Sequence, residues 1–315
     1  MLHGNKNISR RRWLALSTTV LGASLLCDEF VRGAEASPVI PLGFSLYGMK
    51  NLKLHAALQV CGDIGYDCVE LPVMADWPGN PEEFGENARR DFRSALTDNN
   101  LRLTALMENL SALAEGAQHQ ATLDRLQRAA ELAHALSPAA PPLIETVLGG
   151  SPKQWEEAKG RMVECLRDWA KVAESASIII ALKPHVSGAL HTPAAATWLL
   201  SEIDSKQLCL AFDFSHFQLQ KISLEESLDA MLSQTRFVHV KDANGTSDAF
   251  QFLLPGDGKV DYADYFRKLQ AGGYRGDVIV EVSGQIHSRP DYDPVAAAKK
   301  SFHSLDRARR SAMQR

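Results

Sequence analysis

The sequence has few cysteines and no long hydrophobic segment. Only five of its 315 residues are cysteines, and four of them, Cys61, Cys68, Cys165 and Cys209, follow residue 36. None of the four is part of a Cys-x-x-Cys pair, and we expect them to be buried free thiols. No apolar run reaches the roughly 20 residues that a membrane-spanning helix needs, so we expect no stable membrane anchor.

An excess of positive charge is also missing. The net charge is −4 and the isoelectric point is near 6.2. Neither value indicates a nucleic-acid partner. We find no low-complexity tract and no repeat with a period of about 20 to 50 residues. Hydrophobic residues make up 45% of the chain, which is enough to bury one large core. The composition does not indicate an oligomeric state.

Residues 1–36 are typical of a cleavable signal peptide. Three consecutive arginines at 10–12 precede an apolar stretch at 13–26, and the Ala-Glu-Ala of 34–36 fits a cleavage site. The arginines followed by an apolar pair resemble the twin-arginine export signal. An ordinary secretory signal or an uncleaved anchor are the alternatives. We therefore expect a folded domain over 37–315 and export to the periplasm.

Strand-like and helix-like segments alternate eight times along the rest of the chain. The expected strands are 41–47, 66–72, 101–107, 142–148, 177–183, 207–213, 235–241 and 277–283. The expected helices are 53–64, 81–98, 119–136, 152–175, 192–204, 222–233, 260–271 and 294–313. Eight such units predict a single (β/α)8 TIM barrel rather than an open sheet. The weakest strand is 142–148, because Glu145 interrupts it.

Several helix ends have local signals. Ser223 and Glu226 have the spacing of a capping box. Pro81 followed by two glutamates is typical of a first helical turn. Gly65 stands where a helix should end before a strand.

The last three expected strands end in residues that bind metals or transfer protons. Strand 6 ends at Asp213, with His216 three residues later. Strand 7 contains His239 and ends at Lys241, and strand 8 carries Glu281. The carboxyl ends of barrel strands meet at one face, so we expect Asp213, His239 and Glu281 to converge. Two carboxylates and an imidazole suit Mn²⁺, Mg²⁺, Co²⁺ or Zn²⁺.

Each of these residues also has an explanation without a metal. Asp213 could cap a turn with Ser215, and His239 could be a hydrogen-bonded core histidine. Glu281 could instead form an ion pair with Lys183. A buried polar group needs one of these partners, so the sequence leaves both explanations open.

Together these motifs resemble the xylose isomerase-like sugar isomerase/epimerase superfamily over roughly residues 40–300. The motifs are the Asp-x-x-His that begins at Asp213, the His-Val-Lys-Asp of 239–242, the loop 254–262 and Glu281. The resemblance implies one divalent metal held by Glu, Asp, His and Glu from strands 5 to 8. It implies Asp213, His239 and Glu281 as ligands, and His216 as a contact to substrate oxygens near the metal.

The chain departs from this pattern at the end of strand 5, where Lys183 replaces the usual glutamate. In the epimerases of the group two metal-bound glutamates flank the substrate carbon, and here only Glu281 remains. Lys183 could be neutral or act as an acid/base group. It could also replace the metal in an ion cluster with Asp213 and Glu281, or form a Schiff base with a carbonyl substrate. His185 could be a substitute ligand or a substrate contact.

These observations predict an exported isomerase or epimerase that acts on a small sugar or keto-sugar. One divalent metal ion would polarise the carbonyl, Glu281 would act as the base, and Lys183 or His216 would return the proton. The residues expected to contact the substrate are His185, Lys241 and Trp77, with Trp77 as an aromatic wall for the sugar ring.

Other functions stay open. Lys183 makes a keto-sugar lyase or hydratase the main alternative, and a non-catalytic periplasmic sugar-binding barrel is another. An endonuclease of the same superfamily is disfavoured, because the acidic net charge opposes DNA binding. The glycine-containing loop 253–262 is either a plain connection to the next helix or a lid over the substrate.

Overall fold

The computed structural model describes residues 39–314, which form a closed barrel of eight parallel strands. The order around the barrel is β1, β10, β7, β6, β5, β4, β3, β2. The strands are β1 (Leu42–Ser45), β2 (Cys68–Pro72), β3 (Arg102–Asn109), β4 (Leu143–Val147), β5 (Ile180–Leu182), β6 (Leu208–Asp213), β7 (Thr235–Val240) and β10 (Val278–Val280). Each expected strand has a counterpart, so the predicted TIM barrel is confirmed. The expected signal peptide, residues 1–36, lies outside the described residues.

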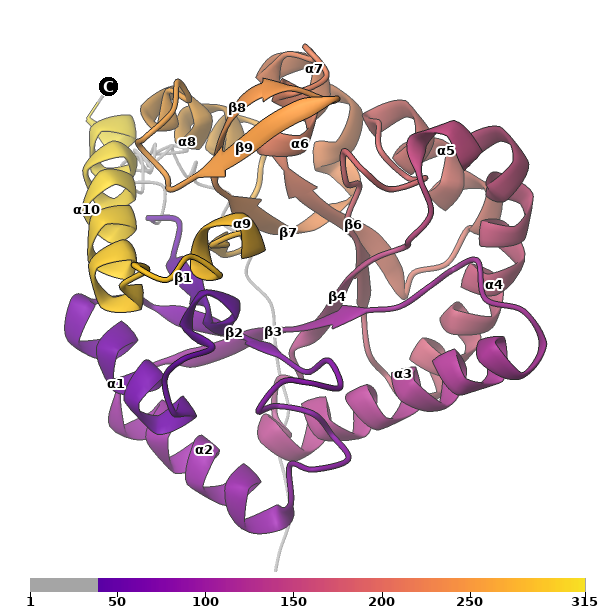
Figure 1. Cartoon of the computed structure of the whole chain (residues 1–315), viewed down its shortest axis with the longest axis horizontal. Helices are drawn as coiled ribbons and strands as arrows, with labels where there is room; N and C mark the ends of the chain where they lie inside the picture. The colour runs from indigo at the N-terminus through magenta and orange to yellow at the C-terminus, as the bar shows by residue number, and fades with distance from the viewer. Residues whose placement is uncertain (1–38, 315) are drawn as a thin grey trace, which may run out of the picture. The chain divides into compact units, whose positions relative to one another are not determined.

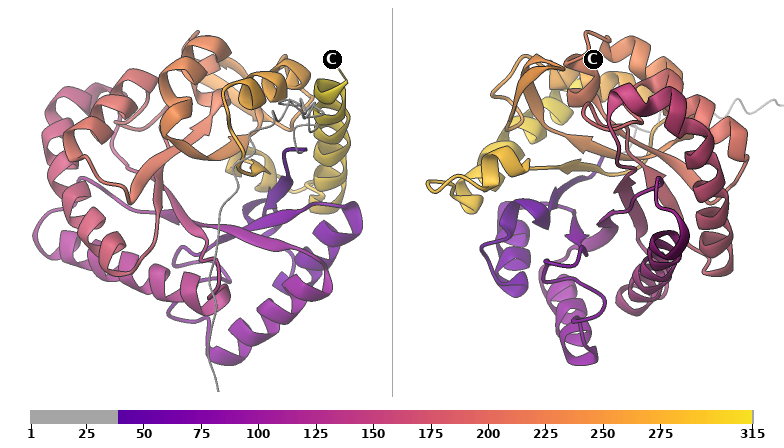
Figure 2. Two further views of the ribbon diagram at one scale, coloured as in Figure 1. Left: turned by 180° about the vertical axis from the view of Figure 1, so that it is seen from behind. Right: turned by 45° about the vertical axis from the view of Figure 1, so that its right-hand side comes forward.

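Within residues 39–314, eight helices of at least eight residues surround the barrel, as expected (Figure 1). They are α1 (Leu54–Ile64), α2 (Glu86–Asp98), α3 (Gly116–Leu136), α4 (Trp155–Ser175), α5 (Pro193–Ile203), α7 (Leu224–Met231), α8 (Tyr262–Ala271) and α10 (Pro294–Met313). The short elements are η1 (Leu46–Met49), η2 (Pro152–Gln154), α6 (Phe214–Gln218), η3 (Leu232–Gln234) and α9 (Gly284–His287). Figure 2 shows the C-terminal helix α10, in yellow, beside α1 and β1. The barrel closes where β10 pairs with β1. Among the described helices, none is long and apolar enough to cross a membrane.

Local signals explain where most helices begin and end. The Ser223 side chain accepts a hydrogen bond from the amide of Glu226, as its capping-box position predicts. Gly65 ends α1 with a φ of 102°, a backbone conformation that favours glycine. The expected helix start at Pro81 is wrong, because α2 begins at Glu86. The residues before it form a turn in which the Asn80 side chain accepts from the amide of Glu82.

One hairpin was not expected from the sequence. Strands β8 (Asp242–Thr246) and β9 (Ala249–Leu253) form an antiparallel pair that follows β7. Phe252 of β9 is buried in a small apolar cluster on this hairpin. The loop after the hairpin is anchored, because the amides of Gly256 and Gly258 donate to the Asp242 carboxylate at 2.7 and 2.9 Å. This anchoring favours a connection to α8 over a lid.

The barrel interior has an apolar layer and a polar layer. The apolar layer contains Cys68, Ala105, Leu143, Ala181, Ala211, Phe237 and Ile279. Side chains two positions apart on a strand point to the same side. Two residues beyond this layer stand Glu70, Glu145, Lys183, Asp213, His239 and Glu281. The strand alternation therefore puts six ionisable side chains at one level of the barrel. The four described cysteines are buried and free, as predicted.

Candidate active site

Lys183 lies at the centre of the polar layer. Its ammonium is 2.9 Å from Oε1 of Glu145 and 3.0 Å from Oε2 of Glu281. Burial alone would lower the pKa of Lys183, but the charges of Glu145 and Glu281 outweigh it and raise the pKa above its ordinary value. Lys183 is therefore a firmly protonated ammonium that carries its charge inside the barrel.

His239 is held between two carboxylates. Its Nε2 lies 3.0 Å from Oε2 of Glu70, and its Nδ1 lies 3.1 Å from Oε2 of Glu281. Burial disfavours the charged ring, but Glu70 and the hydrogen bond to Glu281 raise the pKa of His239 to about 9. A pKa of about 9 favours the protonated imidazole, although Nδ1 lies 3.1 Å from the Lys183 ammonium as well, and that charge opposes protonation.

A second lysine joins strands β6, β7 and β10. The Lys241 ammonium donates to Oδ2 of Asp213 and lies 2.9 Å from Oε2 of Glu281. Oδ1 of Asp213 accepts from the amide and the hydroxyl of Ser215, so Asp213 also caps the turn that begins α6. Burial and the nearby Lys241 charge lower the pKa of His216 to about 4, which leaves that ring neutral.

Glu281 is the carboxylate at which these groups meet. Burial raises its pKa, but Lys183, Lys241 and the hydrogen bond from His239 together bring the pKa well below its usual range. Its side chain is 12% exposed and lines a cavity of about 290 Å³. The polar side chains in the same wall are Tyr47, Asn109, Glu145, Lys183, His185 and Ser187. Glu281 is thus ionised, fixed in position and open to a small molecule.

The structure separates the predicted site residues into three groups. Donor atoms of Asp213, His239 and Glu281 lie within 4.8 Å of one another. Lys183 and His185 line the cavity beside Glu281. The other three predicted residues lie outside the wall of this cavity. The His216 ring contacts the His185 ring, with centroids 4.2 Å apart, and Lys241 is buried. Trp77 lines a neighbouring cavity.

Sequence reasoning missed three residues of this site. Glu145 appeared to weaken its strand, yet it is buried and paired with Lys183. A carboxylate inside an apolar run was therefore the signal that could have found it, and the same is true of Glu70 in β2. Tyr47, just after β1, lines the cavity, and burial together with the charge of Glu281 raises the pKa of its hydroxyl.

The residues of this chain do not fit the four-ligand metal site that the resemblance implies. Lys183 takes the place of the fourth ligand, and its ammonium lies 3.0 Å from Oε2 of Glu281. The ammonium of Lys241 lies 2.9 Å from the same oxygen. A divalent ion on that oxygen would lie beside both ammonium groups, and like charges repel strongly where water is scarce. The lysines therefore occupy the place of the cation.

A second group of potential metal ligands also lies beside positively charged side chains. Glu70, Glu145 and His239 also lie within 4.8 Å of one another. Oε1 of Glu70 accepts no hydrogen bond from the described residues, and Oε1 of Glu145 has no donor in regular hydrogen-bond geometry, which is the best argument for a cation there. However, Oε1 of Glu145 already pairs with the Lys183 ammonium, and the pKa of His239 favours its protonated form. A divalent ion would have to displace these positive charges.

The chain is similar to curated proteins that are named as a dehydratase and an epimerase. It is 26% identical over 145 residues to an inosose dehydratase from Lactiplantibacillus plantarum, a match that covers 41% of this chain and 47% of the relative. It is 21% identical over 261 residues to a fructoselysine 3-epimerase from Shigella flexneri, which covers 79% of this chain and 92% of the relative. The chain thus spans only about half the length of the dehydratase that it matches.

Solved structures show the same fold. The IOLI protein with a bound zinc atom has a TM-score of 0.71 at 19% identity, covering 85% of this chain and 99% of that chain. A xylose isomerase-like TIM barrel protein from Mycobacterium smegmatis in complex with magnesium has a TM-score of 0.66 at 15% identity, covering 87% and 98%. The model of the family described as xylose isomerase-like TIM barrel matches residues 58–308. The chain therefore belongs to the xylose isomerase-like TIM barrel family.

Proposed function

We propose that this protein is an enzyme that removes the proton next to the carbonyl group of a small keto-sugar and then eliminates a neighbouring hydroxyl group. The observation that carries the proposal is Glu281, an ionised carboxylate held by three cationic groups at the wall of a small cavity. The relatives support the substrate class, since they are named as a dehydratase of inosose and an epimerase of fructoselysine. Dehydrating a hydroxy ketone and inverting a carbon next to a carbonyl both begin with loss of that proton.

The cavity suits one sugar ring. Its volume of about 290 Å³ is at the small end of the range for small-molecule sites. The Tyr47 hydroxyl, the Asn109 amide and the His185 ring offer hydrogen bonds to hydroxyl groups in its wall. Burial and the neighbouring His216 lower the pKa of His185 to about 2, so this ring is neutral and adds no charge.

The chain's own residues supply a base and a positive field. Glu281 accepts the proton, and the electrons of the broken C–H bond form a C=C bond as negative charge moves to the carbonyl oxygen. Lys183 stabilises that charge, because its ammonium is fixed and poorly solvated before the substrate arrives. When the C=O bond re-forms, the neighbouring hydroxyl leaves with the electron pair and departs as water after gaining a proton. The neutral Tyr47 phenol stands in the same wall as a donor.

Elimination needs one base, and of the two carboxylates in the wall Glu281 is the more accessible, with 12% of its side chain exposed against 2% for Glu145. Epimerisation requires a second group that exchanges a proton with the opposite face of the carbon. Lys183 replaces the glutamate that the resemblance implies for that role, and its raised pKa means that it does not accept a proton and gives up its own only reluctantly. A Schiff base also requires a neutral amine, which the same raised pKa disfavours. The second candidate function is epimerisation, which is favoured by the match over 92% of the fructoselysine 3-epimerase.

The test is proton exchange in D₂O. The purified protein is mixed with a panel of keto-sugars, and NMR follows deuterium incorporation next to the carbonyl together with any loss of water. We expect exchange with the parent protein and none with Glu281→Gln. Glu157→Gln, an exposed carboxylate of α4 that lines neither this cavity nor the neighbouring one, is the matched control and should keep full exchange. Binding without exchange by the parent protein would contradict the proposal and favour a sugar-binding protein.

A further inference from the structure

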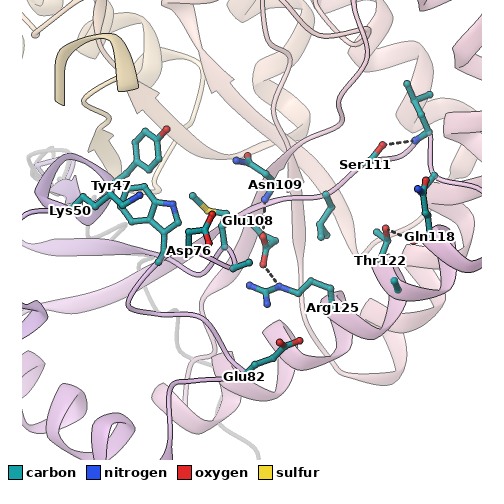
Figure 3. A pocket seen from close by; sticks show the side chains of 17 residues that line it. Tyr47, Lys50, Asp76, Glu82, Glu108, Asn109, Ser111, Gln118, Thr122 and Arg125 are labelled. Atoms are coloured by element: carbon teal, nitrogen blue, oxygen red, sulfur yellow. Dashed lines mark hydrogen bonds and ion pairs between the residues drawn. The ribbon is translucent and has the colours of Figure 1, made fainter. Parts of the chain in front are cut away.

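A second, larger cavity adjoins the one that contains Glu281. Its volume is about 820 Å³, and it shares Tyr47 and Asn109 with the 290 Å³ cavity. Figure 3 shows Tyr47 and Lys50 on one side of it, and Gln118 and Thr122 of α3 on the other. A single sugar ring in the smaller cavity would leave this space unfilled.

We propose that the larger cavity binds a second, uncharged sugar unit, so that the substrate is a glycoside rather than a free monosaccharide. This inference rests on the proposed function, because it assumes that the reacting ring lies beside Glu281. The second sugar unit would occupy the space between η1 and α3. No step of the proposed reaction uses that space.

The walls of the larger cavity have the chemistry that recognises sugars. Leu113 and Met74 supply apolar surface for the C–H faces of a ring, and Trp77 contributes the part of its side chain that Tyr47 and Lys50 leave uncovered. The amide of Gln118, the hydroxyl of Thr122 and the carboxylate of Asp76 supply hydrogen-bonding groups for hydroxyls. The wall therefore offers both apolar surface and hydrogen-bonding groups, and a sugar unit has C–H faces and hydroxyls that need both.

The charges of this cavity disfavour a phosphate. Arg125 donates to the Glu108 carboxylate at 2.7 Å, to the Asn80 side chain at 2.7 Å and to the Val73 carbonyl. Its guanidinium is therefore occupied by the protein itself. Lys50 is the other cation in the wall, and its ammonium lies over the Trp77 ring, 4.6 Å from the centroid. The wall also contains the carboxylates of Asp76 and Glu82. An anionic group would find no surplus positive charge here, whereas an uncharged sugar needs none.

Tyr47 lies at the border between the two cavities, where it would separate two sugar rings of one ligand. Its ring is stacked on Trp77 with centroids 4.7 Å apart, and His287 packs edge-on against it at 4.6 Å. These two contacts hold the Tyr47 ring in place at the border of both cavities. A glycosidic bond that passes Tyr47 and Asn109 would put one sugar unit in each cavity.

The experiment fills the larger cavity and leaves the smaller one unchanged. Ala121 of α3 is exposed and lines the cavity, so Ala121→Trp puts an indole into it. Gln120→Trp is the matched control, because Gln120 is its exposed neighbour outside the wall. Calorimetry measures the binding of methyl glucoside, cellobiose, maltose, trehalose and glucose 6-phosphate. The kcat/KM values are measured for keto derivatives of the four glycosides.

We expect at least one disaccharide to bind about tenfold or more tightly than methyl glucoside. Ala121→Trp should remove that advantage, and Gln120→Trp should keep it. Equal binding of disaccharides and methyl glucoside, or equal effects of the two variants, would overturn the inference. Tighter binding of glucose 6-phosphate, lost in Ala121→Trp, would also overturn it. If no keto-sugar reacts but the binding pattern holds, the proposed reaction fails while the second sugar site stands.

Discussion

The ammonium of Lys183 lies 3.0 Å from Oε2 of Glu281, although β6 and β7 separate their strands in the barrel. The two side chains meet because both point inward at the same level, above the apolar layer of the barrel. The second partner of Lys183, Glu145, comes from the neighbouring strand β4. A lysine thus connects two carboxylates at the place where the family pattern has a metal ligand.

Replacing Lys183 by methionine should destabilise the fold. The change removes the charge but keeps most of the length, which leaves the buried Glu145 and Glu281 without their shared cation. Breaking a buried ion pair costs about 3–5 kcal/mol, and urea denaturation would measure it. Lys171→Met is the control, because Lys171 pairs with Asp168 on the surface, where such pairs contribute roughly 1 kcal/mol or less. A loss no larger than that of the control would show that Lys183 is not needed to balance these carboxylates.

Replacing Lys183 by glutamate should create a metal site. The variant would have the Glu, Asp, His and Glu set that the resemblance implies, and it would lose one of the two ammonium groups. We expect Lys183→Glu to bind Mn²⁺ or Zn²⁺ more tightly than the parent protein by at least about tenfold in calorimetry. Lys171→Glu, which adds the same charge on the surface, should not.

Chelation should leave the activity of the parent protein unchanged. Because the two lysines occupy the place of the cation, dialysis against EDTA should not alter the rate of proton exchange. Elemental analysis of the purified protein before dialysis provides the independent measurement. One tightly held metal ion per chain, with activity lost on chelation and restored by the metal, would contradict the conclusion that the residues do not fit an ion.

Stability should fall in acid partly through Asp306. Burial raises the pKa of this carboxyl, but hydrogen bonds from Arg310 and Arg309, with donors at 2.8 and 2.9 Å, lower it below its ordinary value. A folded-state pKa below the unfolded one contributes stability above about pH 4, and this contribution is lost as the pH falls through the folded value. The Tm of Asp306→Asn should therefore vary less between about pH 5 and pH 3. An equal change of Tm with pH in the parent protein and in Asp306→Asn would refute this prediction.

Export should depend on the paired arginines. We expect the double variant Arg10→Lys, Arg11→Lys to remain in the cytoplasm, because the twin-arginine pattern requires both arginines. Arg32→Lys is the control outside the motif and should not alter export. Cell fractionation followed by immunoblotting measures the distribution. Normal export of the double variant would indicate an ordinary secretory signal.

Much of the fold could be predicted because its signals are local. Each expected strand is a short apolar run, and each long helix follows an amphipathic period, so both depend on neighbouring residues alone. The start of α2 and the hairpin β8–β9 were missed for the opposite reason. Asn80 and the Phe252 cluster stabilise these segments through contacts that the periodicity does not reveal.

The sequence by itself determined that the chain forms eight strand–helix units, and that Lys183, Asp213, His239 and Glu281 stand at the carboxyl ends of strands. The burial of alternate residues depends on the sequence of each segment alone, so it can be predicted without knowing the tertiary structure. Only the tertiary structure decided how these charges pair. Closing the barrel brought Glu70 and Glu145 into the same layer and put Lys183 between two carboxylates. The energy of a buried charge depends on which other charges lie within a few ångströms, and that is set by strand order and register.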